Sequence, residues 1–117
     1  MQSAVTDEGS AVADHLLTEV ALENAQDAPY GFVGAVIGGT TTAGRFDISR
    51  LGGPILAPGF GAQGATAADY FRLYGTCPTG TVLASVSRDI LRAGPSQERL
   101  VVAAHGWQRD LTAASAA

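Results

Sequence analysis

The 117-residue sequence contains no lysine, because all seven of its basic residues are arginines. A mechanism that needs a lysine ammonium group therefore cannot be carried by this chain alone. Cysteine is almost as scarce: the single one, Cys77, excludes an internal disulfide and lacks the spacing of a metal site. We expect neither a metal nor a cofactor.

Two further absences narrow the class of protein. No apolar run approaches the roughly 18 residues that a membrane span needs, and residues 1–8 have neither the basic nor the apolar segment of a signal peptide. Acidic residues outnumber basic ones, 11 to 7, and the net charge is −4. This balance argues against nucleic acid or an anionic membrane as the main partner. We expect a cytoplasmic protein.

What remains is the composition of a globular protein, since 46% of the residues are hydrophobic, enough for one domain with a modest core. Short apolar runs bounded by glycine or proline predict strands over residues 32–37, 54–57 and 81–86. The run over 32–37 is apolar at every position, which is typical of a parallel strand covered on both faces.

Helices are expected over residues 11–24, 67–74, 89–93 and from 97 onward, with Ser10, Thr66 and Ser96 as N-caps. The last helix has an apolar stripe that includes Trp107, which predicts core packing, and residues 112–117 are expected to fray. Strands that alternate with helices predict a parallel α/β sheet. Three strands are too few to close a barrel, so the sheet is either small and open or part of something larger.

Glycines around Gln63 follow the second predicted strand in the sequence Pro-Gly-Phe-Gly-Ala-Gln-Gly, residues 58–64. Glycine lets the backbone approach a ligand closely, and the helix capped by Thr66 would turn its N-terminus toward an anion. Arg88 stands at the end of the third strand and offers a permanently charged, planar fork. Because parallel strands end at one edge of a sheet, Gln63 and Arg88 predict one phosphate site on two loops.

Three segments of the chain resemble the orotidine 5′-phosphate decarboxylase family, in particular its longer bacterial type. Residues 32–40, 54–64 and 82–88 are similar to the sixth, seventh and eighth strands of that family's (β/α)₈ barrel, with their exits. The resemblance covers nearly all of residues 1–117. It implies the C-terminal part of a TIM barrel, a helix followed by three βα units, that is incomplete as a barrel.

The resemblance also implies roles in binding orotidine monophosphate or its product, uridine monophosphate (UMP). Gln63 would close over the substrate and contact its phosphate, and Arg88 would pair with the phosphate dianion. Gly61 and Gly64 would supply closely approaching backbone, and Pro58 would lie near the pyrimidine.

The family's catalytic array, Asp-x-Lys-x-x-Asp in its early strands, is not in this lysine-free chain. We therefore assign it no catalytic residue and expect it to be inactive alone. Activity would require the N-terminal barrel portion, while a homo-oligomer would be another way to cover the open sheet. One alternative is a stand-alone phosphate- or nucleotide-binding module without catalysis. Another is the last part of a different phosphate-binding barrel enzyme.

Overall fold

The computed structural model describes residues 4–5, 11–27, 29–41 and 46–116. In chain order its elements are α1 (Val12–Asn24), β1 (Ala35–Val36), the 3₁₀ helix η1 (Ile48–Arg50), β2 (Ile55–Ala57), α2 (Ala67–Tyr74), β3 (Val82–Ala84), α3 (Arg88–Leu91) and α4 (Gln97–Ala116). The strands form one parallel sheet in the order β1-β2-β3. The predicted order of helices and strands is confirmed, with η1 as the only helix between β1 and β2 in the described chain.

Each strand is shorter than its apolar run predicted. β1 begins late because the Val33 N–H donates to the side chain of Asn24 instead of to a neighbouring strand. Pairing nevertheless extends past the end of β1, where the amides of Ile37 and Gly39 donate to the carbonyls of Leu56 and Pro58 at 2.9 and 2.7 Å. These bonds hold the exits of β1 and β2 side by side.

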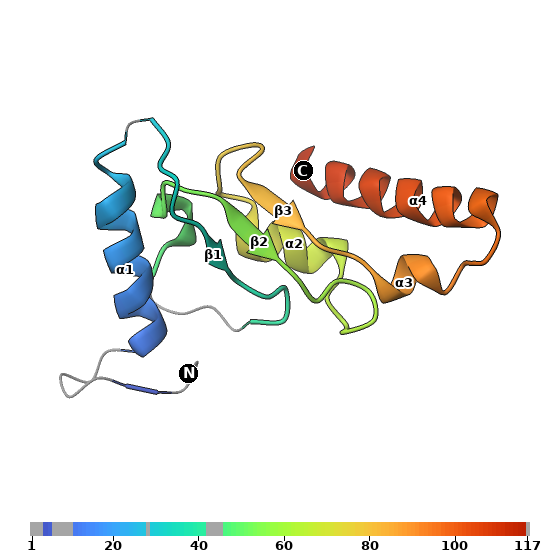
Figure 1. The fold of residues 1–117 in the computed structure, drawn as a ribbon, viewed down its shortest axis with the longest axis horizontal. Helices are drawn as coiled ribbons and strands as arrows, with labels where there is room; N and C mark the ends of the chain where they lie inside the picture. Colours follow the sequence, from blue (N-terminus) through green and yellow to red (C-terminus); the bar gives the residue numbers. More distant parts are fainter. Residues whose placement is uncertain (1–3, 6–10, 28, 42–45, 117) are drawn as a thin grey trace.

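One face of the sheet is covered and the other is open. Ile55 and Ala57 of β2 are fully buried in one core cluster with Tyr74 of α2, and Figure 1 shows α2 on one side of the sheet. The neighbouring positions Val36, Leu56 and Leu83 lie in register across the three strands and are 70%, 44% and 60% exposed. The prediction that the first strand is covered on both faces is therefore wrong for the described residues.

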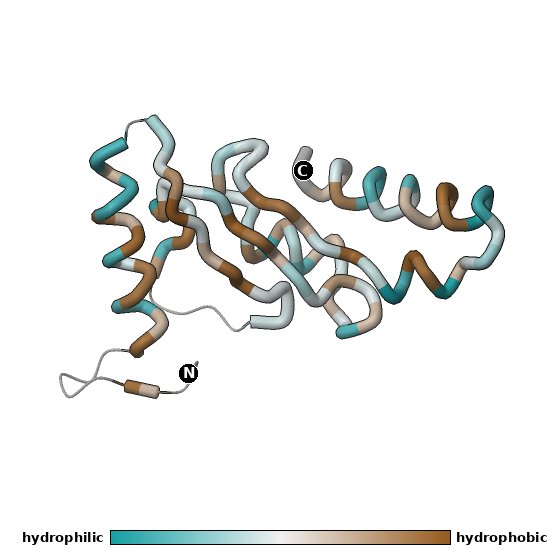
Figure 2. The backbone as a smooth tube through the Cα atoms, in the orientation of Figure 1, coloured by the Kyte–Doolittle hydropathy of each residue, from teal (hydrophilic) through white to brown (hydrophobic). Residues whose placement is uncertain are grey.

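The open sheet gives the molecule an elongated shape. Its radius of gyration is 15.9 Å and its extents are 52 × 31 × 25 Å, whereas a compact domain of this length has a radius of about 13 Å. Figure 1 shows α1 beside β1 at one end and α4 beyond β3 at the other. Figure 2 shows hydrophobic residues running along the strands between them.

The helix ends differ in part from expectation. Thr66 caps α2 as predicted, and together with Asp69 it forms a reciprocal capping box. Ala11 occupies the N-cap of α1 without a side-chain bond, and the predicted cap Ser10 lies outside the described residues. α4 continues to Ala116, so the prediction that the helix frays from residue 112 is wrong for residues 112–116. The helix continues because this segment is rich in alanine, which has the highest helix propensity.

Candidate phosphate site

A small cavity lies at the carboxyl ends of β2 and β3. Its volume is about 130 Å³, and it is lined by Pro58, Gly59, Phe60, Ala62, Gln63, Ser85, Ser87 and Arg88. Since a water molecule occupies about 30 Å³ of the liquid, the space equals about four waters. The cavity therefore has room for a small group such as phosphate, and it is smaller than the roughly 300 Å³ at which sites for drug-sized ligands begin.

The loop after β2 is closed on itself by backbone hydrogen bonds. The Gly61 N–H donates to the Ala65 carbonyl at 2.9 Å, and the Ala65 N–H returns to the Gly59 carbonyl at 3.1 Å. Gly59, Gly61 and Gly64 all have positive φ, which side chains rarely tolerate. The result is a tight loop that leaves Gln63 exposed at the cavity.

Arg88 is the first residue of α3 and brings a positive charge to the opposite side of the cavity. Its side chain is exposed, and it makes no ion pair or hydrogen bond within residues 4–5, 11–27, 29–41 and 46–116. The following residue, Asp89, bonds instead to Trp107 and approaches Arg92. An unneutralised guanidinium at the mouth of a phosphate-sized cavity favours an anionic ligand.

Three of the five predicted site residues line the cavity: Pro58, Gln63 and Arg88. Gly61 and Gly64 shape the loop but do not line the cavity, and their amides donate within the loop. Ser85 and Ser87, which add two hydroxyl groups, were not predicted as site residues. The two serines lie two positions apart at the end of the third strand, and this spacing could have predicted them, because alternate residues of extended backbone face the same side.

The N-terminus of α2, which we expected to face the anion, is not among the cavity's lining residues. It is occupied by its own capping box, in which the Thr66 N–H donates to Asp69 Oδ2 at 2.9 Å. Hydrogen bonds from Thr66 lower the pKa of Asp69. The carboxylate therefore satisfies this helix end and would repel a second anion.

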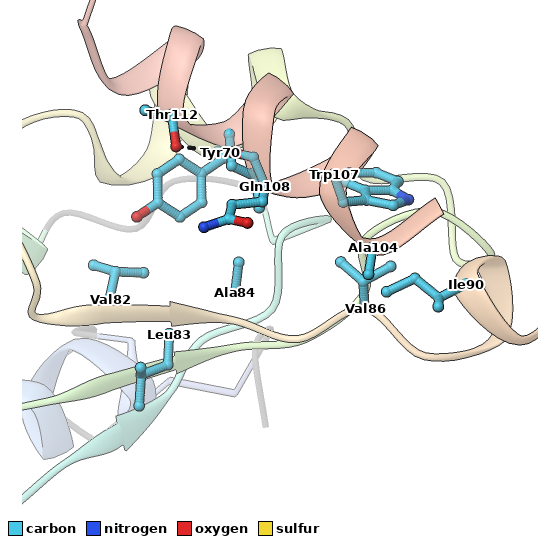
Figure 3. Close-up of a pocket in the computed structure, with 11 residues that line it drawn as sticks. Tyr70, Val82, Leu83, Ala84, Val86, Ile90, Ala104, Trp107, Gln108 and Thr112 are labelled. Carbon is cyan, nitrogen blue, oxygen red and sulfur yellow. Dashed lines mark hydrogen bonds between the residues drawn. The ribbon is translucent and has the colours of Figure 1, made fainter. Parts of the chain in front are cut away.

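A second, larger groove of about 600 Å³ runs between β3 and α4 (Figure 3). Val82 and Ala84 face it from the strand, and Trp107 and Leu111 line it from the helix. β3 pairs only with β2 among the described strands, so its outer edge borders this groove. Figure 3 shows Leu83 on the opposite side of the strand. The groove and the exposed sheet face thus flank an open strand edge.

Two other kinds of site are absent from the described residues. None of the helices described is both long enough and apolar enough to cross a membrane. Nor do three or more histidine, cysteine, aspartate or glutamate side chains gather there in a group that could hold a metal ion.

Similar proteins agree on one family name. The chain is 43% identical over 105 residues to an orotidine 5′-phosphate decarboxylase of Streptomyces coelicolor, covering 89% of this chain and 37% of the relative. A Salinispora arenicola relative of the same name is 40% identical, with coverages of 97% and 41%. A solved structure from Streptomyces avermitilis, assigned to the same enzyme, superposes with a TM-score of 0.78 at 41% identity, covering 99% of this chain and 40% of that one. No protein-family model matches.

Proposed function

The chain is homologous to about two fifths of orotidine 5′-phosphate decarboxylases, and from this we propose that it provides the part of such an enzyme that binds the substrate phosphate. The observation that carries the proposal is the small cavity lined by both Gln63 and Arg88, whose guanidinium has no partner among the described residues. The reaction would convert orotidine monophosphate into UMP and CO₂, in pyrimidine biosynthesis and in the cytoplasm.

Each lining group has a role that fits a phosphate monoester. The Arg88 guanidinium donates charge-assisted hydrogen bonds to the dianion, and the Gln63 amide closes over it from the glycine loop. The hydroxyls of Ser85 and Ser87 are further donors at the end of β3. Pro58, at the cavity's sheet side, would lie toward the pyrimidine.

The reacting centre has to come from outside this chain. The cavity is too small for a whole nucleotide, and the sequence has no lysine to protonate the carbanion that is left when CO₂ departs. Phosphate binding energy accelerates such a reaction only if it is used at the reacting carbon. The chain alone is therefore inactive in this proposal.

We propose that the partner is the remaining portion of the barrel. The exposed apolar side chains of Val36, Leu56 and Leu83 and the groove beside β3 support this partner, because strands of a barrel bury both faces and pair at both edges. A homo-oligomer would cover the same surface differently. The second candidate function is a stand-alone phosphate- or nucleotide-binding module without catalysis, in which Gln63 and Arg88 would supply the phosphate contacts.

Calorimetric titration tests phosphate binding in both candidates. We expect the chain to bind UMP in preference to uridine, which has no phosphate. Arg88→Ala should weaken UMP binding by about 1.5–3 kcal/mol, the range for hydrogen bonds to charged groups. Arg99→Ala, which removes the same charge from the exposed surface of α4, is the matched control. Equal affinity of wild type and Arg88→Ala for UMP would exclude the phosphate site.

Turnover separates an enzyme portion from a binding module. The purified chain should show no decarboxylation of orotidine monophosphate, in a preparation free of host enzyme. Turnover by the chain alone, abolished by Arg88→Ala, would overturn the assignment of the reacting centre to a partner.

A further inference from the structure

Trp107 and Asp89 form a side-chain contact that links α4 to the start of α3. The Trp107 Nε1–H donates a hydrogen bond of 2.8 Å to Asp89 Oδ2. The apolar stripe of α4 predicted only core packing for Trp107, and neither residue lines the described phosphate cavity. The hydrogen bond nevertheless attaches α4 to Asp89, the residue that directly follows Arg88 in the sequence.

The glycine loop packs against the same pair. A Cβ atom on Gly61 would lie 2.6 Å from Asp89 Cβ and 2.8 Å from Asp89 Cγ, so only glycine permits this approach. The φ of Gly61, +73°, favours glycine as well. Beside it, Phe60 packs edge-on against Trp107, with ring centroids 6.3 Å apart. Consecutive loop residues thus contact Trp107 and Asp89.

These contacts connect the two sides of the cavity. Asp89 directly follows Arg88, and Gly61 stands two residues before Gln63. A shift of Asp89 relative to Gly61 would therefore change the separation of the guanidinium and the amide. A ligand that meets a preformed site avoids the cost of ordering both loops.

We propose that Trp107 and Asp89 are positioning residues that hold Gln63 and Arg88 at the spacing of a phosphate monoester. The inference rests on the proposed phosphate site and extends it to α4, which supplies no lining residue of that cavity. Asp89 acts through its shape and its acceptor oxygen. Its replacement by asparagine, which keeps both, should therefore be tolerated, whereas alanine should not.

The test compares affinities for UMP by calorimetry on the full chain. Asp89→Ala and Trp107→Phe should each weaken UMP binding by about tenfold, in keeping with the loss of one hydrogen bond to a charged group. Asp89→Asn should restore affinity to within about threefold of wild type, because its carbonyl oxygen still accepts the Trp107 bond. Val102→Ala, an exposed change on the same helix, is the control.

The Trp107→Phe variant keeps the inference testable if Asp89→Ala fails to fold, because it retains an aromatic ring beside Phe60 but has no Nε1–H to donate to Asp89. Wild-type affinity for UMP in either variant, once it is folded, would overturn the inference. Absence of UMP binding by wild type would overturn the phosphate site itself.

Discussion

Asn24 is the buried polar residue on which the entry to the sheet depends. It is 3% exposed, and its amide nitrogen donates to the carbonyls of Val33 and Leu51 at 2.9 and 2.8 Å. Its oxygen accepts from the Val33 N–H at 3.0 Å. One side chain therefore joins the end of α1 to the segments that lead into β1 and β2.

Asn24→Ala should lower the free energy of unfolding by at least about 2 kcal/mol, because each buried group that loses its partner costs about 1–3 kcal/mol. Urea denaturation measures the change, and Gln26→Ala on the exposed surface is the control. Asn24→Asp should not rescue, since a carboxylate oxygen would face two carbonyls. Stability within error of wild type would contradict the role of Asn24.

Tyr74 is the buried residue with the clearest pH consequence. It is 2% exposed, and its hydroxyl donates to the Ile37 carbonyl at 2.6 Å. Burial raises the pKa of Tyr74 from 10.0 to about 12. The folded state therefore favours the protonated hydroxyl, and this stabilisation is complete below pH 10 and is lost as the pH rises toward 12.

Wild type should accordingly lose about 2–3 kcal/mol of stability between pH 10 and 12 relative to Tyr74→Phe, which cannot ionise there. Denaturant unfolding at pH 8, 10 and 12 follows the difference. Tyr30→Phe, at a site that is 39% exposed, should keep the wild-type slope. Parallel pH profiles for wild type and Tyr74→Phe would show that burial of Tyr74 does not shift its titration.

At the scale of elements, the capping box of α2 should contribute to the stability of the fold and not to ligand binding. Thr66→Ala should cost about 0.5–2 kcal/mol of stability, as for other N-caps. It should leave UMP affinity unchanged, because Thr66 does not line the phosphate cavity. Thr66→Ser, which keeps the hydroxyl, is the matched control. A loss of UMP affinity in folded Thr66→Ala would instead indicate that the phosphate binds at the N-terminus of α2.

The order of helices and strands was predictable from the apolar runs and the glycines and prolines that bound them. It was also predictable that Gln63 and Arg88 lie at one cavity, because the ends of neighbouring parallel strands meet at one edge of a sheet. Strand bounds were not, since the side chain of Asn24 takes the Val33 amide out of the ladder. The Trp107–Asp89 bond was not predictable either. It joins residues 18 apart through tertiary packing, and no local pattern encodes it.

At the scale of the whole molecule, the open sheet face should cause association. In sedimentation velocity we expect the chain alone to form species larger than its 11.9 kDa monomer, because exposed apolar strands and free edges attract other chains. Replacing both Leu56 and Leu83 by serine should shift the chain toward monomer, whereas Val102→Ser on α4 should not. A monodisperse wild-type monomer would instead favour a stand-alone module.

We propose above all that this chain is the phosphate-binding portion of a decarboxylase barrel. The most direct measurement co-expresses it with the part of the Streptomyces coelicolor relative that it does not match, and assays orotidine monophosphate turnover. We predict turnover only when both parts are present, and a loss of it with Arg88→Ala but not with Arg99→Ala. A purified complex of the two parts that converts no substrate, beside an active full-length relative, would contradict the claim.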